Sequence, residues 1–203
     1  MKRKKLLSII AIIALLALIA VCTWILISKS HVKEAANSAI DTLNKEHYEG
    51  LNSFFADGNS LDNLAEADPE IAALGFGSAE SEAADYSLFN TLLINADVKL
   101  KSVNPFSKTV TLSVTNADFS TFFSDNRDAA CESESDLIDL ILSYADTHQQ
   151  ITSVITLPYE KTDSGITIDF NSREFINAYL GGFMQSYSDE YYAGIETILE
   201  GGD

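Results

Sequence analysis

Cysteine is scarce in this chain of 203 residues. Only Cys22 and Cys131 occur, and Cys22 lies inside a long apolar run. The rest of the chain therefore has one thiol and no internal disulfide, so its fold must rest on side-chain packing. No Asn-X-Ser/Thr sequon occurs either, which is compatible with a bacterial surface protein.

The motifs of common catalytic and nucleotide-binding sites are missing as well. The sequence has no phosphate-binding loop, no Gly-X-Ser-X-Gly and no dinucleotide fingerprint. Its three histidines are scattered and lack the spacing of a zinc site. We therefore predict no catalytic, cofactor-binding or metal-binding residues and no cofactor.

Positive charge is scarce beyond residue 30, where 8 Lys and Arg face 30 Asp and Glu, a formal charge of 8 − 30 = −22. Such a surface repels the phosphates of nucleic acids and the headgroups of anionic lipids. Nucleic acid is therefore not an expected partner. The acidic residues are spread along the chain, as is typical of a solvated exterior.

One long apolar run stands out against this acidic chain. Residues 6–27 carry no charge, and these 22 residues span roughly 33 Å as a helix, enough for a bilayer core of about 30 Å. Four basic residues precede the run and Lys29 follows it, which predicts a cytoplasmic N-terminus. The expected parts are a cytoplasmic tail (1–5), a transmembrane helix (6–27), a juxtamembrane segment (28–30) and one extracytoplasmic domain (31–203).

Two alternatives for the apolar run are a cleaved signal peptide and lipidation of Cys22. A signal peptide usually has an apolar core of about 7–15 residues, and Ser28-Lys29-Ser30 is a poor cleavage site. Val21 stands where a lipidation motif needs a small residue, and the run continues past Cys22 to Ile27. An uncleaved, single-pass signal anchor in the cell membrane is the favoured interpretation.

Apolar residues recur every three or four positions over 31–55, which predicts a helix with a kink near 44–50. No proline or glycine separates this helix from the apolar run, so we expect one continuous rod. Residues 82–93 are ambiguous, with a helix or irregular structure favoured. Further helices are expected over 118–146 and from Asn171 onward to Ile198.

Apolar and polar residues alternate in two other regions. Val98, Leu100 and Ser102 are followed, after a turn at 104–107, by a strand over 109–115. Residues 151–157 and 166–170 flank a second turn at 162–165. Both regions predict antiparallel hairpins with one wet face. The expected fold class is α+β, with a curved antiparallel sheet of two hairpins packed on helices.

Three segments carry a family resemblance: AANSAIDTLNKEHYEGLNSFF (35–55), TVTLSVTNADFSTFF (109–123) and ITLPYEKTDSGITIDFNSREFINAYLGG (155–182). Together they resemble small membrane-anchored or lipidated surface domains of Gram-positive bacteria, which are similar to the nuclear-transport-factor-like and cystatin-like cone folds. This chain departs from them in the helix between its hairpins and in the turn 163–166, which lacks a tryptophan. The resemblance implies a fold and a location in the cell envelope, but no reaction.

Cys131 could act as a nucleophile only beside a base such as His148 or His47. Neighbouring Glu132 and Glu134 should raise the pKa of its thiol, which disfavours the thiolate. An incidental thiol is the favoured interpretation.

The acidic cluster at 125–136 lacks the central glycine and the final glutamate of an EF-hand. Weak calcium binding is possible in principle, but a solvated helix entrance is favoured. Aromatic residues on the last expected helix could line a pocket, although at this spacing they indicate a core: Phe183, Tyr187, Tyr191 and Tyr192. The last two are adjacent, so one of them should reach the surface or a partner.

Two functions follow from these observations. The first is a membrane-anchored extracytoplasmic domain of the bacterial cell envelope that binds a protein, a peptide or a small envelope ligand. The alternative is a pocket enzyme on a ketosteroid-isomerase-like cone, with Asp118 or Asp169 as a buried acid. Because Asp169 lies on the strand face opposite Ile168 and Phe170, we expect it to be solvated. Binding is therefore favoured over catalysis.

Overall fold

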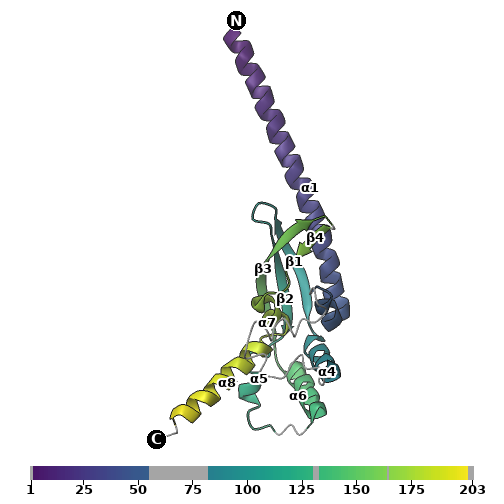
Figure 1. The fold of residues 1–203 in the computed structure, drawn as a ribbon, viewed down its shortest axis with the longest axis vertical. Coiled ribbons are helices and arrows are strands. Elements are labelled where there is room, and N and C mark those ends of the chain that lie inside the picture. Colours follow the sequence, from purple (N-terminus) through teal and green to yellow (C-terminus); the bar gives the residue numbers. More distant parts are fainter. Residues whose placement is uncertain (1, 55–81, 130–132, 164, 201–203) are drawn as a thin grey trace.

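The computed structural model describes residues 2–54, 82–129, 133–163 and 165–200, and its fold is α+β (Figure 1). A long N-terminal helix leads into a four-stranded antiparallel sheet that packs on helices. The predicted fold class is confirmed.

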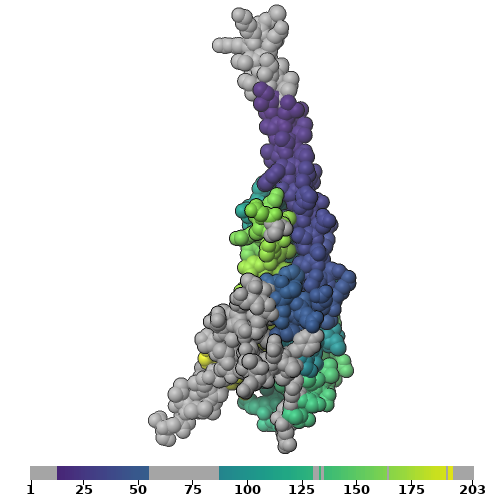
Figure 2. All heavy atoms as spheres, turned by 45° about the vertical axis from the view of Figure 1, so that its right-hand side comes forward, coloured from purple at the N-terminus to yellow at the C-terminus, as the bar shows by residue number. Residues whose placement is uncertain are grey.

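Helix α1 (Lys2–Asn52) runs without interruption from the apolar run into the folded domain. Its side chains from Ile13 to Ile27 are mostly exposed, and Val32 is the first buried residue among those whose exposure is described. The N-terminal part projects alone from the domain (Figure 2). The helix is long and apolar enough to cross a membrane. The prediction of one continuous rod is confirmed.

The predicted kink in α1 occurs at His47, whose backbone angles (φ 47°, ψ −109°) are not helical. Beyond this residue the chain makes little more than one further turn before the helix ends at Asn52. Leu43 and Leu51, on either side of the kink, are both buried. The bend therefore keeps the last turn of α1 in contact with the core.

Four strands form the sheet in the order β1-β2-β3-β4: β1 (Asp97–Asn104), β2 (Thr109–Ala117), β3 (Gln150–Thr162) and β4 (Gly165–Ile168). All neighbours are antiparallel, so both predicted hairpins are confirmed. The inner face carries pairs such as Leu112 and Ile155, both buried. On the outer face Thr111 bonds Thr156 across the strands, and neighbouring Val154 is 62 % exposed.

A bulge interrupts β1. The register with β2 shifts between Leu100 and Ser102, which leaves Lys101 as an extra residue. Each residue added to one strand exchanges the two faces beyond it. Val103 therefore turns inward and is buried, while Ser102 is exposed. The prediction that Ser102 continues the apolar face was wrong.

Helix α4 (Glu82–Leu93) resolves the ambiguous segment as helical. The single helix expected over 118–146 is instead two helices, α5 (Phe122–Asp125) and α6 (Glu134–Thr147). Helix α6 begins afresh at Ser133, whose side chain forms a capping box with Asp136. Such a box satisfies backbone donors at a helix start, which explains why a new helix begins here.

The final expected helix is also divided, into α7 (Arg173–Tyr179) and α8 (Phe183–Glu200). Ser172 caps α7, by accepting a hydrogen bond from the Phe175 N–H. Between the helices Gly181 and Gly182 have positive φ angles of 63° and 86°. A Cβ on Gly181 would lie 2.0 Å from the Ala117 carbonyl oxygen. These glycines let the chain turn against the end of β2.

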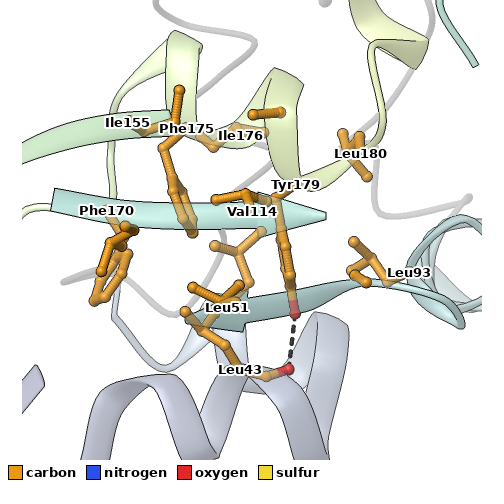
Figure 3. Close-up of a cluster of buried hydrophobic side chains, with 14 of the residues drawn as sticks. Leu43, Leu51, Leu93, Val114, Ile155, Phe170, Phe175, Ile176, Tyr179 and Leu180 are labelled. Atoms are coloured by element: carbon orange, nitrogen blue, oxygen red, sulfur yellow. Dashed lines mark hydrogen bonds between the residues drawn. The ribbon is translucent and has the colours of Figure 1, made fainter. Parts of the chain in front are cut away.

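A chain of buried hydrogen bonds joins four elements. The Asn116 amide on β2 donates to Leu92 O at the end of α4 (2.9 Å) and to Tyr179 O at the end of α7 (2.7 Å). The Tyr179 hydroxyl then donates to Leu43 O in α1 (2.7 Å; Figure 3). We call these contacts the Asn116–Tyr179 bridge. Both side chains are fully buried.

We expect Tyr179→Phe to lower the free energy of unfolding by about 1–2 kcal/mol at neutral pH, because Leu43 O loses its buried donor. Burial raises the pKa of Tyr179 above its usual value of 10. Its contribution is therefore complete below about pH 10 and is lost as the pH rises towards the folded-state pKa. Urea unfolding of the full chain in detergent micelles, at neutral and alkaline pH, measures both effects.

The variant should show a smaller alkaline loss of stability than the parent protein. Tyr192→Phe is the matched control, since Tyr192 is exposed. An unchanged alkaline loss in Tyr179→Phe would contradict this account.

Candidate functional site

The largest hollow that we describe is a groove of about 560 Å³ between α1 and β1. It lies at the end of the domain where α1 enters, beside the edge strand of the sheet. Ten residues line it: Lys29, Lys33, Asn37 and Ile40 from α1, and Val98, Lys99, Leu100, Lys101, Ser102 and Val103 from β1.

Helix and strand geometry explain why four lysines meet in this groove. Lys29, Lys33 and Asn37 are four residues apart and so share one face of α1. Lys99 and Lys101 lie on β1, and the bulge at Lys101 changes the direction of the strand at this point. Lys99 pairs with Asp97, which leaves the other three amines for a ligand. The groove is therefore positively charged.

Asn44 on α1 bonds Val98, one of the strand residues that line the groove. Its side-chain carbonyl accepts a hydrogen bond from Val98 N–H (2.8 Å), and its amide donates to Val98 O (3.0 Å). In this way Asn44 takes the place of a neighbouring strand at the edge of β1. The contact also fixes α1 against the sheet.

Charge is distributed unevenly between the two ends of the domain. The β1–β2 and β3–β4 turns both point towards the projecting part of α1 (Figure 1). A hydrogen bond from Tyr159 N–H on β3 to Lys108 O joins β3 to the β1–β2 turn. We call segments 28–37, 99–109 and 159–163 the entry end. These segments contain six lysines and three carboxylates, whereas the rest of the chain beyond residue 30 has three cationic residues and 27 carboxylates.

Of the two acids proposed for an enzyme, Asp169 is exposed and Asp118 is half-buried. The Asp118 carboxylate accepts hydrogen bonds from the Ser120 N–H and hydroxyl, and Asp169 accepts one from Asn171 N–H. Asp169 does line a second hollow, of about 320 Å³. The expectation that Asp169 is solvated is confirmed, and neither acid has the buried environment that the enzyme alternative requires.

Three described residues of the acidic cluster 125–136 have structural partners, namely Asp125, Arg127 and Asp136. Asp125 accepts hydrogen bonds from the Tyr144 hydroxyl (2.7 Å) and from Thr121 (2.8 Å), and these bonds hold the pKa of its carboxyl below the usual value. Arg127 pairs with Glu190 (2.7 Å). In the described part of the cluster and elsewhere in the described residues, no group of three His, Cys, Asp or Glu side chains could hold a metal.

Cys131 and Glu132 lie outside the described residues, so the structure does not test the interpretation of Cys131 as an incidental thiol. The His148 ring stacks on the Tyr144 ring, with 3.5 Å between their centroids. His47 forms the kink of α1. The two histidines therefore have places in the fold that do not depend on a thiol.

The aromatic residues of α8 belong mainly to the core. Phe183 is buried against Phe122, and Tyr187 is half-buried against Phe123. Tyr192 is 47 % exposed, and the side chain of Tyr191 is outside the described set. This packing supports the interpretation of the stripe as a core rather than a ligand site.

Comparison of the chain with protein-family models, with curated proteins and with solved structures gave no match. The candidate site therefore rests on the geometry of the groove. Sequence reasoning missed this site, although the four-residue spacing of Lys29 and Lys33 on a helix that borders a lysine-bearing strand was a usable signal.

We expect Asn44→Ala to lower the free energy of unfolding by about 1–2 kcal/mol, because both Val98 backbone groups lose their partner at the edge of β1. Amide hydrogen exchange at Val98 should quicken in the same variant. Asn37→Ala, an exposed position on the same face of α1, is the control. It should change the free energy of unfolding by less than about 0.5 kcal/mol and leave the amide exchange at Val98 as in the parent. Equal effects of the two substitutions would contradict the assigned role of Asn44.

Proposed function

We propose that this chain is a single-pass membrane protein of the bacterial cell envelope, with a cytoplasmic N-terminus and an extracytoplasmic α+β domain that binds an anionic ligand. The ligand is a protein segment, a peptide or a small envelope molecule. It meets the domain in the groove between α1 and β1, close to the membrane surface.

The observation that carries this proposal is the continuity of α1. The apolar run ends at Ile27 and the buried core begins at Val32, and the helix continues between them. Four intervening residues rise only about 6 Å along a helix. The domain therefore stands directly above the bilayer surface if residues 6–27 span the bilayer, without a flexible linker between them.

The chemistry of the groove supports an anionic ligand. Lys29, Lys33 and Lys101 converge on it from two elements, in a domain that is otherwise strongly acidic. A carboxylate or phosphate in the groove would gain charge-assisted hydrogen bonds from these amines. The acidic surface elsewhere would steer such a ligand towards the entry end.

The sequence resemblance to anchored surface domains of Gram-positive bacteria supports the same location. Those domains are similar to cone folds in which a curved sheet wraps around helices. The curved sheet and packed helices of this chain are compatible with that resemblance. The family assignment is part of the proposal.

Cysteine labelling tests the orientation. In a background of Cys22→Ser and Cys131→Ser, a single cysteine is placed at the exposed Ser38 or at Lys2. A membrane-impermeant maleimide should label the Ser38→Cys protein in intact cells, since we place this residue outside. The Lys2→Cys protein should be labelled only after lysis. The reverse result would overturn the proposed orientation.

Photo-crosslinking tests the groove. A benzoylphenylalanine residue at Ser102, on the wall of the groove, should form adducts in intact cells, and the intact mass of each adduct identifies the ligand. The same group at Val154, exposed on the outer sheet face, is the control. Combining Ser102 with Lys33→Glu and Lys101→Glu should reduce the yield at least several-fold. Equal yields at positions 102 and 154 would contradict binding in the groove.

A further inference from the structure

The turn between β1 and β2 exposes a large apolar side chain at its tip. Phe106 is 72 % exposed, the most exposed of the large hydrophobic residues described, including those of the apolar run. Its neighbours Pro105 and Lys108 complete a tip that combines an aromatic ring with a cation. Such a combination is typical of residues that lie at a membrane–water interface.

Hydrogen bonds hold this turn in one shape. The Asn104 side chain accepts from Phe106 N–H (3.0 Å) and from Ser107 N–H (3.3 Å), and the Ser107 and Thr109 hydroxyls lie 2.8 Å apart. Lys108 O accepts from Tyr159 N–H on β3 (2.9 Å). The outward position of Phe106 is therefore a feature of an ordered turn, which costs little entropy when the ring contacts a surface.

The position of the turn follows from the contact between Asn44 and Val98. From Val98 to Asn104, β1 advances six residues, or about 20 Å at about 3.3 Å per residue. His31 lies the same distance, about 20 Å, from Asn44 along α1, at about 1.5 Å per residue. The two elements run side by side in opposite directions (Figure 1), and Lys29 lines the same groove as Val103.

Phe106 lies in the turn just beyond Asn104, and so close to the level of His31 and Lys29. The apolar run ends two residues further, at Ile27. The headgroup layer occupies about 5–7 Å on each side of the hydrocarbon core. The tip of the β1–β2 turn therefore reaches this layer when residues 6–27 span the core.

We propose that the entry end of the domain docks on the membrane that α1 crosses, with the Phe106 ring inserted among the headgroups and the surrounding lysines bound to the phosphates of anionic phospholipids. This inference rests on the proposed function in one respect, namely that α1 spans the membrane. It also identifies the anionic ligand of the groove as a lipid headgroup. Lys29, Lys33, Lys101 and Lys108 supply the positive charge.

The local charge favours this partner. Three carboxylates lie on the entry end, Glu34, Glu160 and Asp163, against its six lysines, and Asp97 beside it pairs with Lys99, so that an excess of two positive charges is left. Each lysine close to an anionic surface contributes about 1 kcal/mol to the free energy of docking, which is about a fivefold change in the ratio of docked to undocked protein. The carboxylates of described residues outside the entry end lie on the rest of the domain, and screening over about 8 Å in physiological salt weakens their effect on the membrane.

The test uses the full chain reconstituted into vesicles. Trp24→Phe removes the single tryptophan, and Phe106→Trp then reports the depth of the turn through quenching by brominated lipids. In phosphatidylcholine with 30 % phosphatidylglycerol we expect a blue-shifted emission and strong quenching. In phosphatidylcholine alone both should be weaker. Lys101→Glu with Lys108→Glu should lower the ratio of docked to undocked protein at least 25-fold.

Val154→Trp in the same background is the matched control, because Val154 is exposed in the middle of the outer sheet face. It should show no quenching in either lipid. Equal quenching at positions 106 and 154, or no quenching at 106 in anionic vesicles, would overturn the inference.

Two further outcomes separate this inference from its premise. Flotation of the protein with the vesicles reports insertion of α1. A protein that floats but has an unquenched Trp at position 106 would overturn the docking proposal and leave the proposed membrane anchor unaffected. A protein that does not float with the vesicles would contradict the proposal that α1 spans the membrane. Loss of quenching on addition of polyphosphate, at ionic strength matched with sodium chloride, would assign the lysines to a soluble polyanion and overturn the lipid assignment.

Discussion

The fold depends on the Asn116–Tyr179 bridge, a short series of buried hydrogen bonds that ties one strand to three helices. Asn116 is completely buried, and an amide in that position would cost several kcal/mol without partners. Its two donors and its oxygen are all satisfied, by Leu92 O, by Tyr179 O and by Ala117 N–H. A fully satisfied buried network allows few alternative packings, so it fixes the relative positions of its elements. Tyr179 extends the network to Leu43, and so joins α1 to the same centre.

This attachment gives α1 a structural role beyond that of the proposed membrane anchor. The residues of α1 from Val32 to Leu51 supply part of the core, and Asn44 completes the edge of β1. Because the helix is continuous, the same contacts that stabilise the fold would set the tilt and height of the domain above the bilayer in the proposed arrangement. The groove and the β1–β2 turn then lie at a fixed level. A flexible linker would have separated these two properties, and the chain has none between Ile27 and Val32.

Local periodicity was sufficient to predict the fold class, both hairpins, the continuous rod and its kink. What it could not predict were interruptions that depend on tertiary contacts. The apolar stripe from Phe175 to Met184 reads as one helix, but Gly181 must approach the Ala117 carbonyl so closely that only a break at two glycines fits. Likewise, nothing in the alternation of β1 distinguishes a regular strand from one with a bulge at Lys101. The groove was missed for the same reason, because it exists only where α1 and β1, more than 50 residues apart, pack together.

The net charge illustrates how a whole-chain quantity differs from a local one. A formal charge of −22 beyond residue 30 indicated repulsion of anionic headgroups, and that argument treats the charge as evenly spread. Exposed charges interact appreciably only within about a screening length, which is about 8 Å at physiological ionic strength. A membrane below the entry end therefore responds to six lysines and three carboxylates rather than to the average. The carboxylates of described residues outside the entry end have the complementary effect of disfavouring orientations that bring them towards the headgroups. The same acidic composition that argues against anionic partners in general thus favours one particular pose on an anionic surface.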